Sequence, residues 1–188
     1  MGREAVRGAR YWGQMTPFSF EHVFQAPSTA AVFAGYFDAA HQIEQDREME
    51  IVERETLELV DDGETLRRVC RVVPKRQLPA LIKPFLSGPL HYVETVIWHR
   101  SSDEITLDIR PSMLRGRVQI LGTYRLERVG PHEILRRYSG EVSVDIALIS
   151  ARIERGIVQE FEKSMPIAAT CTQRWLDRQI ERSVAARA

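Results

Sequence analysis

A few polar side chains occur among apolar residues on strand-like stretches, and their types could do chemistry. His22 lies between Phe20 and Phe24 in an alternating run. An imidazole has an ordinary pKa of about 6.5, so His22 could act as a general base or as a hydrogen-bonding group for a ligand. The simpler interpretation, which we favour, is a core histidine whose ring nitrogens are satisfied by neighbouring groups.

Glu94 is a second candidate, and its role depends on which face of its strand points inward. It shares one face with Tyr92 and Trp98. If that face is the inner one, Glu94 is a buried carboxyl group, and burial raises a carboxyl pKa toward that of a catalytic acid. If the face with Val93 and Ile97 is the inner one, Glu94 is a solvated surface residue. Both faces carry apolar side chains, so the sequence leaves both orientations open.

Tyr124, Tyr138 and Arg136 lie on strand faces that we expect to point inward. The two phenol hydroxyls could orient a ligand, although buried tyrosines usually find a backbone partner. Arg136 could hold an anionic head group. At a strand end, however, we expect its guanidinium group to reach solvent.

The chain lacks the motifs of the common cofactor and metal sites. It has no Gly-rich dinucleotide motif, no phosphate-binding loop, no HExxH, no GxSxG and no CxxC. Its histidines, at positions 22, 41, 91, 99 and 132, are scattered and none is paired at helical metal-site spacing. We therefore expect no metal and no cofactor, and we assign no catalytic residue.

The composition narrows the classes of protein and partner. The 188 residues have zero formal net charge, with 44% hydrophobic and 28% charged residues, which is typical of a soluble globular chain and argues against nucleic acid as the main partner. No apolar run reaches the length of about 18 residues that indicates a transmembrane segment. The N-terminal stretch lacks a signal-peptide core, and Cys70 and Cys171 are expected to be free thiols, so we expect a cytoplasmic protein. The oligomeric state stays open.

Alternation and turn signals predict the elements that position these side chains. Residues 16–26 alternate as a strand, Ser28 or Thr29 begins a short helix, and a second polar helical segment follows at residues 38–46. Short turns then separate four further strand-like runs, which predicts one antiparallel sheet with one covered face. These runs are residues 91–100, 104–110, 116–128 and 133–146.

A hairpin is predicted between these two groups of elements. Residues 49–60 and 64–73 flank an Asp-Gly turn at residues 61–63. We interpret the charged residues of the hairpin as cross-strand pairs on an exposed face and not as a site. They are Glu53, Glu55, Arg67, Arg68 and Arg71.

A Pro-rich segment at residues 74–90 separates the hairpin from the later strands. Its prolines, at positions 74, 79, 84 and 89, exclude a long helix or a central strand. It holds too many apolar residues for an ordinary solvated loop. We expect a short amphipathic turn that forms a lid over an opening, with Leu81, Ile82 and Phe85 as its contacts.

The last fifth of the chain predicts one long helix. Apolar residues recur every four positions from Ile149 to Met165, which places them on one helical face. Ser150 is expected to be the N-cap, and Pro166 is expected to kink the helix near Glu162. At 1.5 Å per residue the helix would be about 50 Å long.

Together these elements predict an α+β fold, in which a curved antiparallel sheet of about seven strands wraps round the long C-terminal helix. Residues 16–183 would form a single domain, flanked by a flexible arm at residues 1–15 and a disordered tail at residues 184–188. One helix cannot fill the hollow of such a sheet, so we expect a cavity of about 300–1,000 Å³. The residues expected to line it are Phe20, His22, Phe24, Tyr92, Glu94, Trp98, Tyr124, Tyr138, Ile157, Phe161 and Met165.

The order of the elements resembles the helix-grip superfamily, which includes START domains, the allergen Bet v 1 and polyketide cyclases (SRPBCC-type proteins). The closer likeness is to an uncharacterised bacterial domain family within it. The likeness covers residues 17–182 and rests on Trp98, on residues 122–126 (GTYRL), on Gly140, Val142 and Val144, on residues 149–154 (ISARIE) and on Trp175 with Leu176. Ser150 and Ala151 stand where that family usually has glycines. The resemblance implies a cavity for a hydrophobic ligand and no fixed set of catalytic residues.

Three hypotheses about function follow, in order of preference. The first is the binding or transport of a small hydrophobic molecule, such as a lipid, an isoprenoid or a polyketide-like compound. The second is a cofactor-independent cyclase or aromatase, which needs at least two groups among His22, Glu94 and the tyrosines within hydrogen-bond reach of each other. The third is a protein-interaction module that uses the Pro-rich segment or the Arg-rich tail.

Overall fold

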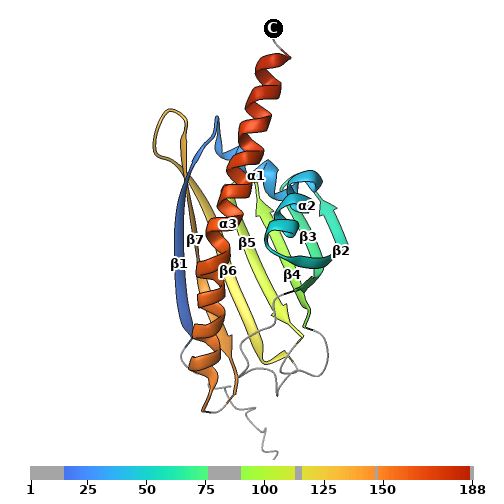
Figure 1. Cartoon of the computed structure of the whole chain (residues 1–188), viewed down its shortest axis with the longest axis vertical. Coiled ribbons are helices and arrows are strands. Elements are labelled where there is room, and N and C mark those ends of the chain that lie inside the picture. Colours follow the sequence, from blue (N-terminus) through green and yellow to red (C-terminus); the bar gives the residue numbers. More distant parts are fainter. Residues whose placement is uncertain (1–14, 76–89, 113–115, 147, 187–188) are drawn as a thin grey trace, which may run out of the picture.

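One antiparallel sheet forms the frame of the molecule. The computed structural model describes residues 15–75, 90–112, 116–146 and 148–186. Within this part of the chain, seven strands lie in the order β1-β7-β6-β5-β4-β3-β2, and the sheet curves round helix α3 (Figure 1). The elements are β1 (Thr16–Gln25), α1 (Thr29–Phe37), α2 (Ala39–Glu48), β2 (Ile51–Asp61), β3 (Thr65–Pro74), β4 (Tyr92–His99), β5 (Glu104–Pro111), β6 (Val118–Arg128), β7 (Glu133–Val144) and α3 (Ser150–Ala185).

This arrangement confirms the predicted α+β, helix-grip architecture. The strands and helices follow one another in the expected order, and their boundaries differ by a few residues. The last strand ends at Val144, and α3 continues to Ala185, which lies inside the segment expected to be a tail. The expected arm up to residue 14 and the expected lid residues Leu81, Ile82 and Phe85 lie outside the described residues.

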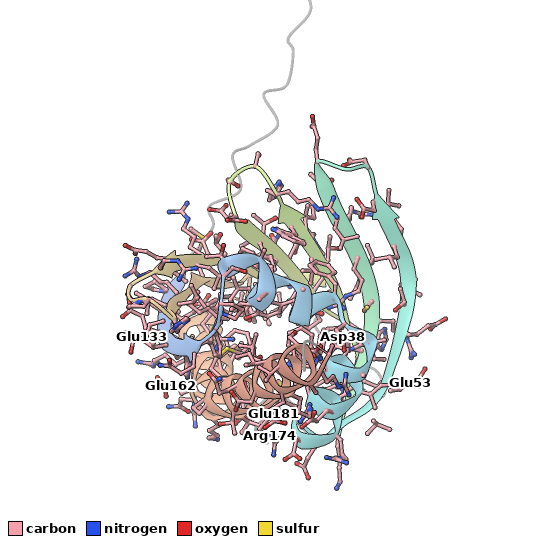
Figure 2. The ribbon with its side chains drawn as sticks, turned by 90° about the horizontal axis from the view of Figure 1, so that it is seen from above. Asp38, Glu53, Glu133, Glu162, Arg174 and Glu181 are labelled. Atoms are coloured by element: carbon pink, nitrogen blue, oxygen red, sulfur yellow. The ribbon has the colours of Figure 1, made fainter. Side chains whose placement is uncertain are left out.

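Side-chain caps fix the starts of the two short helices. The hydroxyl of Ser28 accepts a hydrogen bond from the backbone N–H of Ala31 at 3.1 Å, which confirms the predicted start of α1. The Asp38 carboxylate accepts from the backbone N–H of His41 at 2.7 Å and begins α2. In the view from above, Asp38 lies beside α3, whereas Glu53 points away from the outer side of β2 (Figure 2).

The strand register places one continuous set of side chains on the concave face of the sheet. Directly opposed pairs run across it, such as Tyr124 with Tyr138 and Glu94 with Ile109. Val96 is only 4% exposed and lies on the same face as Glu94, which settles the orientation of β4 that the sequence left open. Because side chains alternate along a strand, this register turns the whole inner set toward α3.

Helix α3 lies along this concave face. Its buried residues follow a helical period and include Ile153, Ile157, Met165, Ala168, Trp175 and Leu176. The Glu154 side chain is 1% exposed, and its carboxylate accepts from the backbone N–H of Val144 at 2.9 Å and from the Thr16 hydroxyl at 2.7 Å. These bonds join the first turn of α3 to β7 and β1.

The start of α3 corrects one prediction. Ser150 is the first helical residue rather than the N-cap, because its hydroxyl donates to the carbonyl of Ile146 at 2.5 Å and accepts from the N–H of Ile146 at 3.0 Å. Its oxygen is therefore not available to the N–H groups of the first turn. The helix is continuous across Pro166, and a bend of its axis near Glu162 stays a prediction.

Trp175 anchors the second half of α3 on the joint between α1 and α2. Its indole N–H donates to the Asp38 carboxylate, with Nε1 and Oδ1 3.2 Å apart. A Cβ atom at Gly35 would lie 3.1 Å from the Trp175 ring, so the absence of a side chain there permits close packing. This contact fixes where the helices close one end of the hollow between sheet and α3.

Candidate functional site

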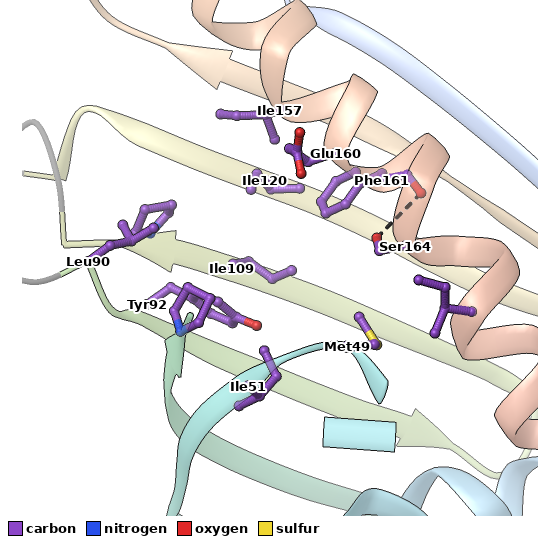
Figure 3. A pocket seen from close by; sticks show the side chains of 13 residues that line it. Met49, Ile51, Leu90, Tyr92, Ile109, Ile120, Ile157, Glu160, Phe161 and Ser164 are labelled. Carbon is purple, nitrogen blue, oxygen red and sulfur yellow. Dashed lines mark hydrogen bonds between the residues drawn. The ribbon is translucent and has the colours of Figure 1, made fainter. Parts of the chain in front are cut away.

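An apolar cavity lies between the middle of α3 and the sheet. Its volume is about 180 Å³. Figure 3 shows Ile157 and Phe161 of α3 facing Ile109 and Ile120 of the sheet across this space, with Met49 at its side. Pro74, Leu90 and Pro111 also line this space. We call this space the outer cavity.

A second cavity, of about 120 Å³, continues from the first toward α1 and α2. The two share Met49, Tyr92, Ile109, Phe161 and Ser164 as wall residues, so they are compartments of one hollow. The walls of the second compartment are more polar, and we call it the inner cavity. Its polar residues include Gln42, Arg54, Arg68, Glu94 and Arg136.

Each compartment is smaller than the cavity of about 300–1,000 Å³ expected from the sequence. Aromatic rings and long charged side chains fill part of the hollow. Tyr124 and Tyr138 stack with their ring centroids 4.2 Å apart, and Phe161 packs against Tyr138 at 6.1 Å. The hollow therefore consists of two narrow compartments in series and not of the single wide cavity expected from the sequence.

Arg54 bridges two carboxylates in the wall of the inner cavity. Its Nε lies 2.9 Å from Asp46 Oδ2, and its Nη1 lies 2.9 Å from Glu94 Oε1. Burial alone lowers the pKa of Arg54, but the charges of Glu94 and Asp46 outweigh it and raise that pKa above its ordinary value. Glu94 thus points inward and is bound in an ion pair.

Arg136 is 1% exposed, which corrects the expectation that it reaches solvent. Its Nη1 donates to the Tyr36 hydroxyl at 2.8 Å, and its Nη2 lies 3.1 Å from His22 Nδ1. Its guanidinium carbon lies 5.1 Å from the Phe24 ring centroid and 5.5 Å from that of Tyr124. Helix α1 covers this part of β7 through Tyr36, so the side chain cannot extend past the sheet.

The contact with Arg136 defines the protonation of His22. A guanidinium group only donates hydrogen bonds, so His22 Nδ1 must accept and the ring proton must lie on Nε2. Burial and then the positive charge of Arg136 lower the pKa of His22 below 6.5. His22 is therefore a neutral hydrogen-bond acceptor for Arg136, as the simpler interpretation of the sequence proposed.

Arg68 is the third guanidinium group of the inner cavity. Its Nη2 donates to Gln42 Oε1 at 3.1 Å, and its guanidinium carbon lies 5.2 Å from the Phe37 ring centroid. Its Nε is buried and has no hydrogen-bond partner among the described residues. The expectation that Arg68 belongs to an exposed face of charge pairs is therefore wrong. The outer face of the hairpin does carry such pairs, including that of Arg71 with Glu53 at 3.2 Å.

The stacked tyrosines contribute neutral phenol groups. Burial raises the pKa of Tyr124 and of Tyr138 well above the ordinary value, so neither forms a phenolate near neutral pH. Gly122 makes the position of Tyr138 possible, because a Cβ atom there would lie 2.5 Å from the Tyr138 ring. The two hydroxyl groups can donate hydrogen bonds but are poor proton acceptors.

The structure brings together seven of the residues expected to line the cavity. They are Tyr92, Glu94, Tyr124, Tyr138, Ile157, Phe161 and Met165. The other four lie in the surrounding core and outside both compartments. Phe20 stacks on Phe18, Phe24 packs beneath Arg136, His22 binds Arg136, and Trp98 lies against Phe33 and Phe37.

Sequence reasoning missed the polar residues that the hairpin and α2 contribute. Arg68 lies between Leu66 and Cys70 on one strand face, and this apolar alternation is a signal that could have placed it inside. Arg54 carries no such signal, because irregularities at residues 51–53 and 56–58 shift the register of β2. Gln42 and Asp46 lie on a mainly polar helix, where nothing in the sequence distinguishes them from solvated residues.

The described part of the chain shows no other cluster with evident chemistry. It contains no group of three or more His, Cys, Asp or Glu side chains arranged to hold a metal ion. No helix in it is long and apolar enough to span a membrane. Cys70 and Cys171 are buried and free.

Solved structures of very different sequence share this fold. The Zhui aromatase/cyclase from Streptomyces sp. R1128 matches with a TM-score of 0.65 and 11% identity, over 89% of this chain and 96% of that one. A START superfamily protein from Mycobacterium smegmatis matches with a TM-score of 0.57 and 12% identity, over 87% and 98%. Ara h 8.0201 matches with a TM-score of 0.59 and 10% identity, over 85% and 98%. At such identities the likeness establishes the helix-grip fold alone.

Comparison of sequences gives a more specific relation. No curated protein matches the chain significantly. One family model matches residues 19–176, which is most of the sheet and of α3. The chain therefore belongs to the family described as "Protein of unknown function (DUF2505)".

Proposed function

We propose that the protein binds a small hydrophobic molecule in the hollow between the sheet and α3. The observation that carries this proposal is the outer cavity, a space of about 180 Å³ whose walls are mainly aliphatic and aromatic. Protein interiors are normally packed without voids larger than a water molecule. A maintained apolar space beside a packed core is what a ligand pocket requires.

The surrounding packing supports a pre-formed pocket. Ile120 and Ile157 are 4% and 5% exposed and belong to the main core, so rigid elements hold the walls. The polar inner cavity adds groups that can orient a ligand, which is the usual division of labour in small-molecule sites. The fold shared with the Zhui aromatase/cyclase and with a START superfamily protein is consistent with such a pocket.

The geometry gives less support to a cyclase or aromatase. That hypothesis needs two proton-transfer groups within hydrogen-bond reach of each other. Glu94 is bound to Arg54 and His22 to Arg136, and no hydrogen bond joins Glu94 to His22 in the described part of the chain. Of the two segments named for the interaction-module hypothesis, the Pro-rich one lies outside the described residues from position 76 to position 89, and the use of the Arg-rich tail stays a prediction.

A thermal-shift panel on the full chain tests the proposal. Fatty acids, isoprenoid alcohols and bicyclic aromatic compounds should each be titrated against the melting temperature. A ligand at a hundredfold excess over its Kd stabilises the folded state by about 2.7 kcal/mol. For a chain of this size, that corresponds to roughly 5–10 °C.

Ser164 offers a specific variant, because it lines both compartments and carries a small side chain. Ser164→Trp should place an indole in the shared space and remove the shift given by any ligand found in the panel. Glu162→Trp is the matched control, since Glu162 lies two residues away on α3 and is exposed. A full shift in Ser164→Trp, or no shift with any compound in the unaltered protein, would contradict the proposal.

A further inference from the structure

The inner cavity has more positive than negative charge. Its walls contain the guanidinium groups of Arg54, Arg68 and Arg136. The carboxylates beside them are Glu94 and Asp46, and both are bound to Arg54. With His22 neutral, the described groups of this compartment leave one positive charge without a counter-ion.

Of the two guanidinium groups that are not bound to a carboxylate among the described residues, Arg136 is more deeply buried than Arg68. It is 1% exposed, its two hydrogen bonds go to uncharged partners, and its Nε has no partner. No carboxylate forms an ion pair with it in the described part of the chain. Removing a charged group from water costs on the order of several kcal/mol when no opposite charge compensates it. Buried charges are therefore normally paired. Arginine also stays protonated in proteins, so the charge remains.

Arg68 likewise has no carboxylate bound to it among the described residues. Its Nε is buried without a hydrogen-bond partner, and among the described residues Gln42 is its one hydrogen-bonding neighbour. Burial lowers the pKa of Arg68 below its ordinary value, although the charge of Glu94 acts in the opposite direction. The guanidinium group is thus held in a desolvated position in which the described residues supply no bound anion.

We propose that the ligand of the hollow is an amphipathic monoanion, whose carboxylate lies in the inner cavity against Arg68 and Arg136 and whose apolar chain extends through the outer cavity. This inference rests on the proposed function and names the ligand class of the same site. A carboxylate matches the single excess charge and the planar, donor-rich guanidinium groups. The two compartments in series, one polar and one apolar, match the two ends of such a molecule.

Isothermal titration calorimetry with decanoic acid and decanamide tests this inference on the full chain. The two probes have the same length and nearly the same shape, and only the acid is charged at pH 7.5. We expect the acid to bind at least about tenfold more tightly, since charged pairs inside a protein contribute more than neutral hydrogen bonds. Equal affinity for both probes would overturn the inference and leave the proposed function intact. If neither probe binds or shifts the melting temperature, the inference falls, and the proposed function is then decided by the other compounds of the thermal-shift panel.

Arginine variants locate the charge recognition. Arg68→Met and Arg136→Met should each reduce the preference for the acid over the amide while decanamide still binds. Arg137→Met is the matched control, because Arg137 lies next to Arg136 on β7 but is exposed and paired with Glu21. Since Arg136→Met risks unfolding the core, Arg136→Lys is the milder second variant, because it keeps the charge and loses only the planar group. An unchanged preference in Arg68→Met and in the Arg136 variants would overturn the inference.

A titration of carboxyl-¹³C decanoic acid measures the pKa of the bound carboxyl group. This pKa would not change if the arginines served only to stabilise the fold. Bound between Arg68 and Arg136, the carboxyl group should stay ionised at least about one pH unit lower than the free acid. Glu94 faces the same compartment and opposes this effect, while Arg54 reinforces it, so the comparison with Arg68→Met isolates the contribution of one arginine. An unshifted titration in the bound state would overturn the inference.

Discussion

His41 is a buried imidazole that the folded state keeps neutral. The side chain is 2% exposed, packs edge-on against Trp175, and its Nε2 has no hydrogen-bond partner among the described residues. Burial lowers the pKa of His41. Asp38 and Glu44 raise that pKa and Arg178 lowers it further, so burial decides the direction. Protonation of His41 therefore favours the unfolded chain.

This state of His41 predicts how the free energy of unfolding depends on pH. The unfolded chain keeps the ordinary pKa of 6.5, so below this pH it binds more protons than the folded protein. Stability should be full above pH 6.5 and should fall as the pH decreases through that value toward the lowered folded-state pKa. Urea titrations from pH 8 to pH 5 measure the trend, and His41→Gln should reduce its slope. His22, whose pKa is also lowered, accounts for a remaining slope. The same change at the exposed His132 is the control, and an unaltered slope in His41→Gln would contradict the assignment.

The arginines show which single residues a sequence can place. The inward face of β3 could have been predicted from the sequence, because Arg68 alternates in step with the apolar residues Leu66, Cys70 and Val72. The burial of Arg136 could not have been predicted in this way, because it depends on Tyr36 of α1, which is a hundred residues away in the chain. A contact between distant segments has no local period, so the sequence could name Glu94 and Arg136 as candidates but could not place their partners Arg54 and Tyr36.

Periodicity predicted the elements well, since each strand and helix has a face that must be buried against the rest. Turn chemistry predicted the hairpin, and the preference of Ser and Thr for helix starts predicted the cap of α1. The start of α3 was misplaced because Ser150 satisfies the backbone of Ile146 rather than the helix N-terminus. A hydroxyl can serve either role, and local sequence alone does not distinguish them.

Pro166 is the element-scale feature with the clearest energetic consequence. It is exposed, lies inside α3, and has no N–H to donate to the carbonyl of Glu162. Pro166→Ala should restore that hydrogen bond and stabilise the protein by about 1–3 kcal/mol. The melting temperature should rise by roughly 2–4 °C per kcal/mol for a chain of this size. Glu162→Ala, in the same exposed turn, is the control and should change the melting temperature little. Destabilisation by Pro166→Ala would instead show that α3 needs a bend there to seat both Met165 and Trp175.

At the scale of the whole molecule, the hollow joins parts of unequal stability. Among the described residues, edge strand β2 pairs with β3 alone, and all of its residues except Ile51 and Arg54 are exposed. The walls opposite belong to the central strands and to α3, which contain the main core. Met49 and Ile51, where α2 leads into β2, line the outer cavity across from Phe161. A ligand there would contact the weakly held edge and the rigid core at the same time.

Hydrogen exchange should therefore detect ligand binding first at the α2–β2 corner. Local opening governs exchange in weakly held segments, and a ligand that contacts only the closed form reduces that opening. With saturating decanoic acid, the amides of residues 46–54 and of residues 161–165 should exchange more slowly, while the exposed turn at residues 129–133 should be unchanged. Ser164→Trp with the same acid is the control and should show no added protection. Unchanged exchange at residues 46–54, under conditions where calorimetry shows saturation, would mean that the acid binds away from this hollow. The reason is that Met49 and Ile51 line the outer cavity and would be in contact with any ligand that fills it.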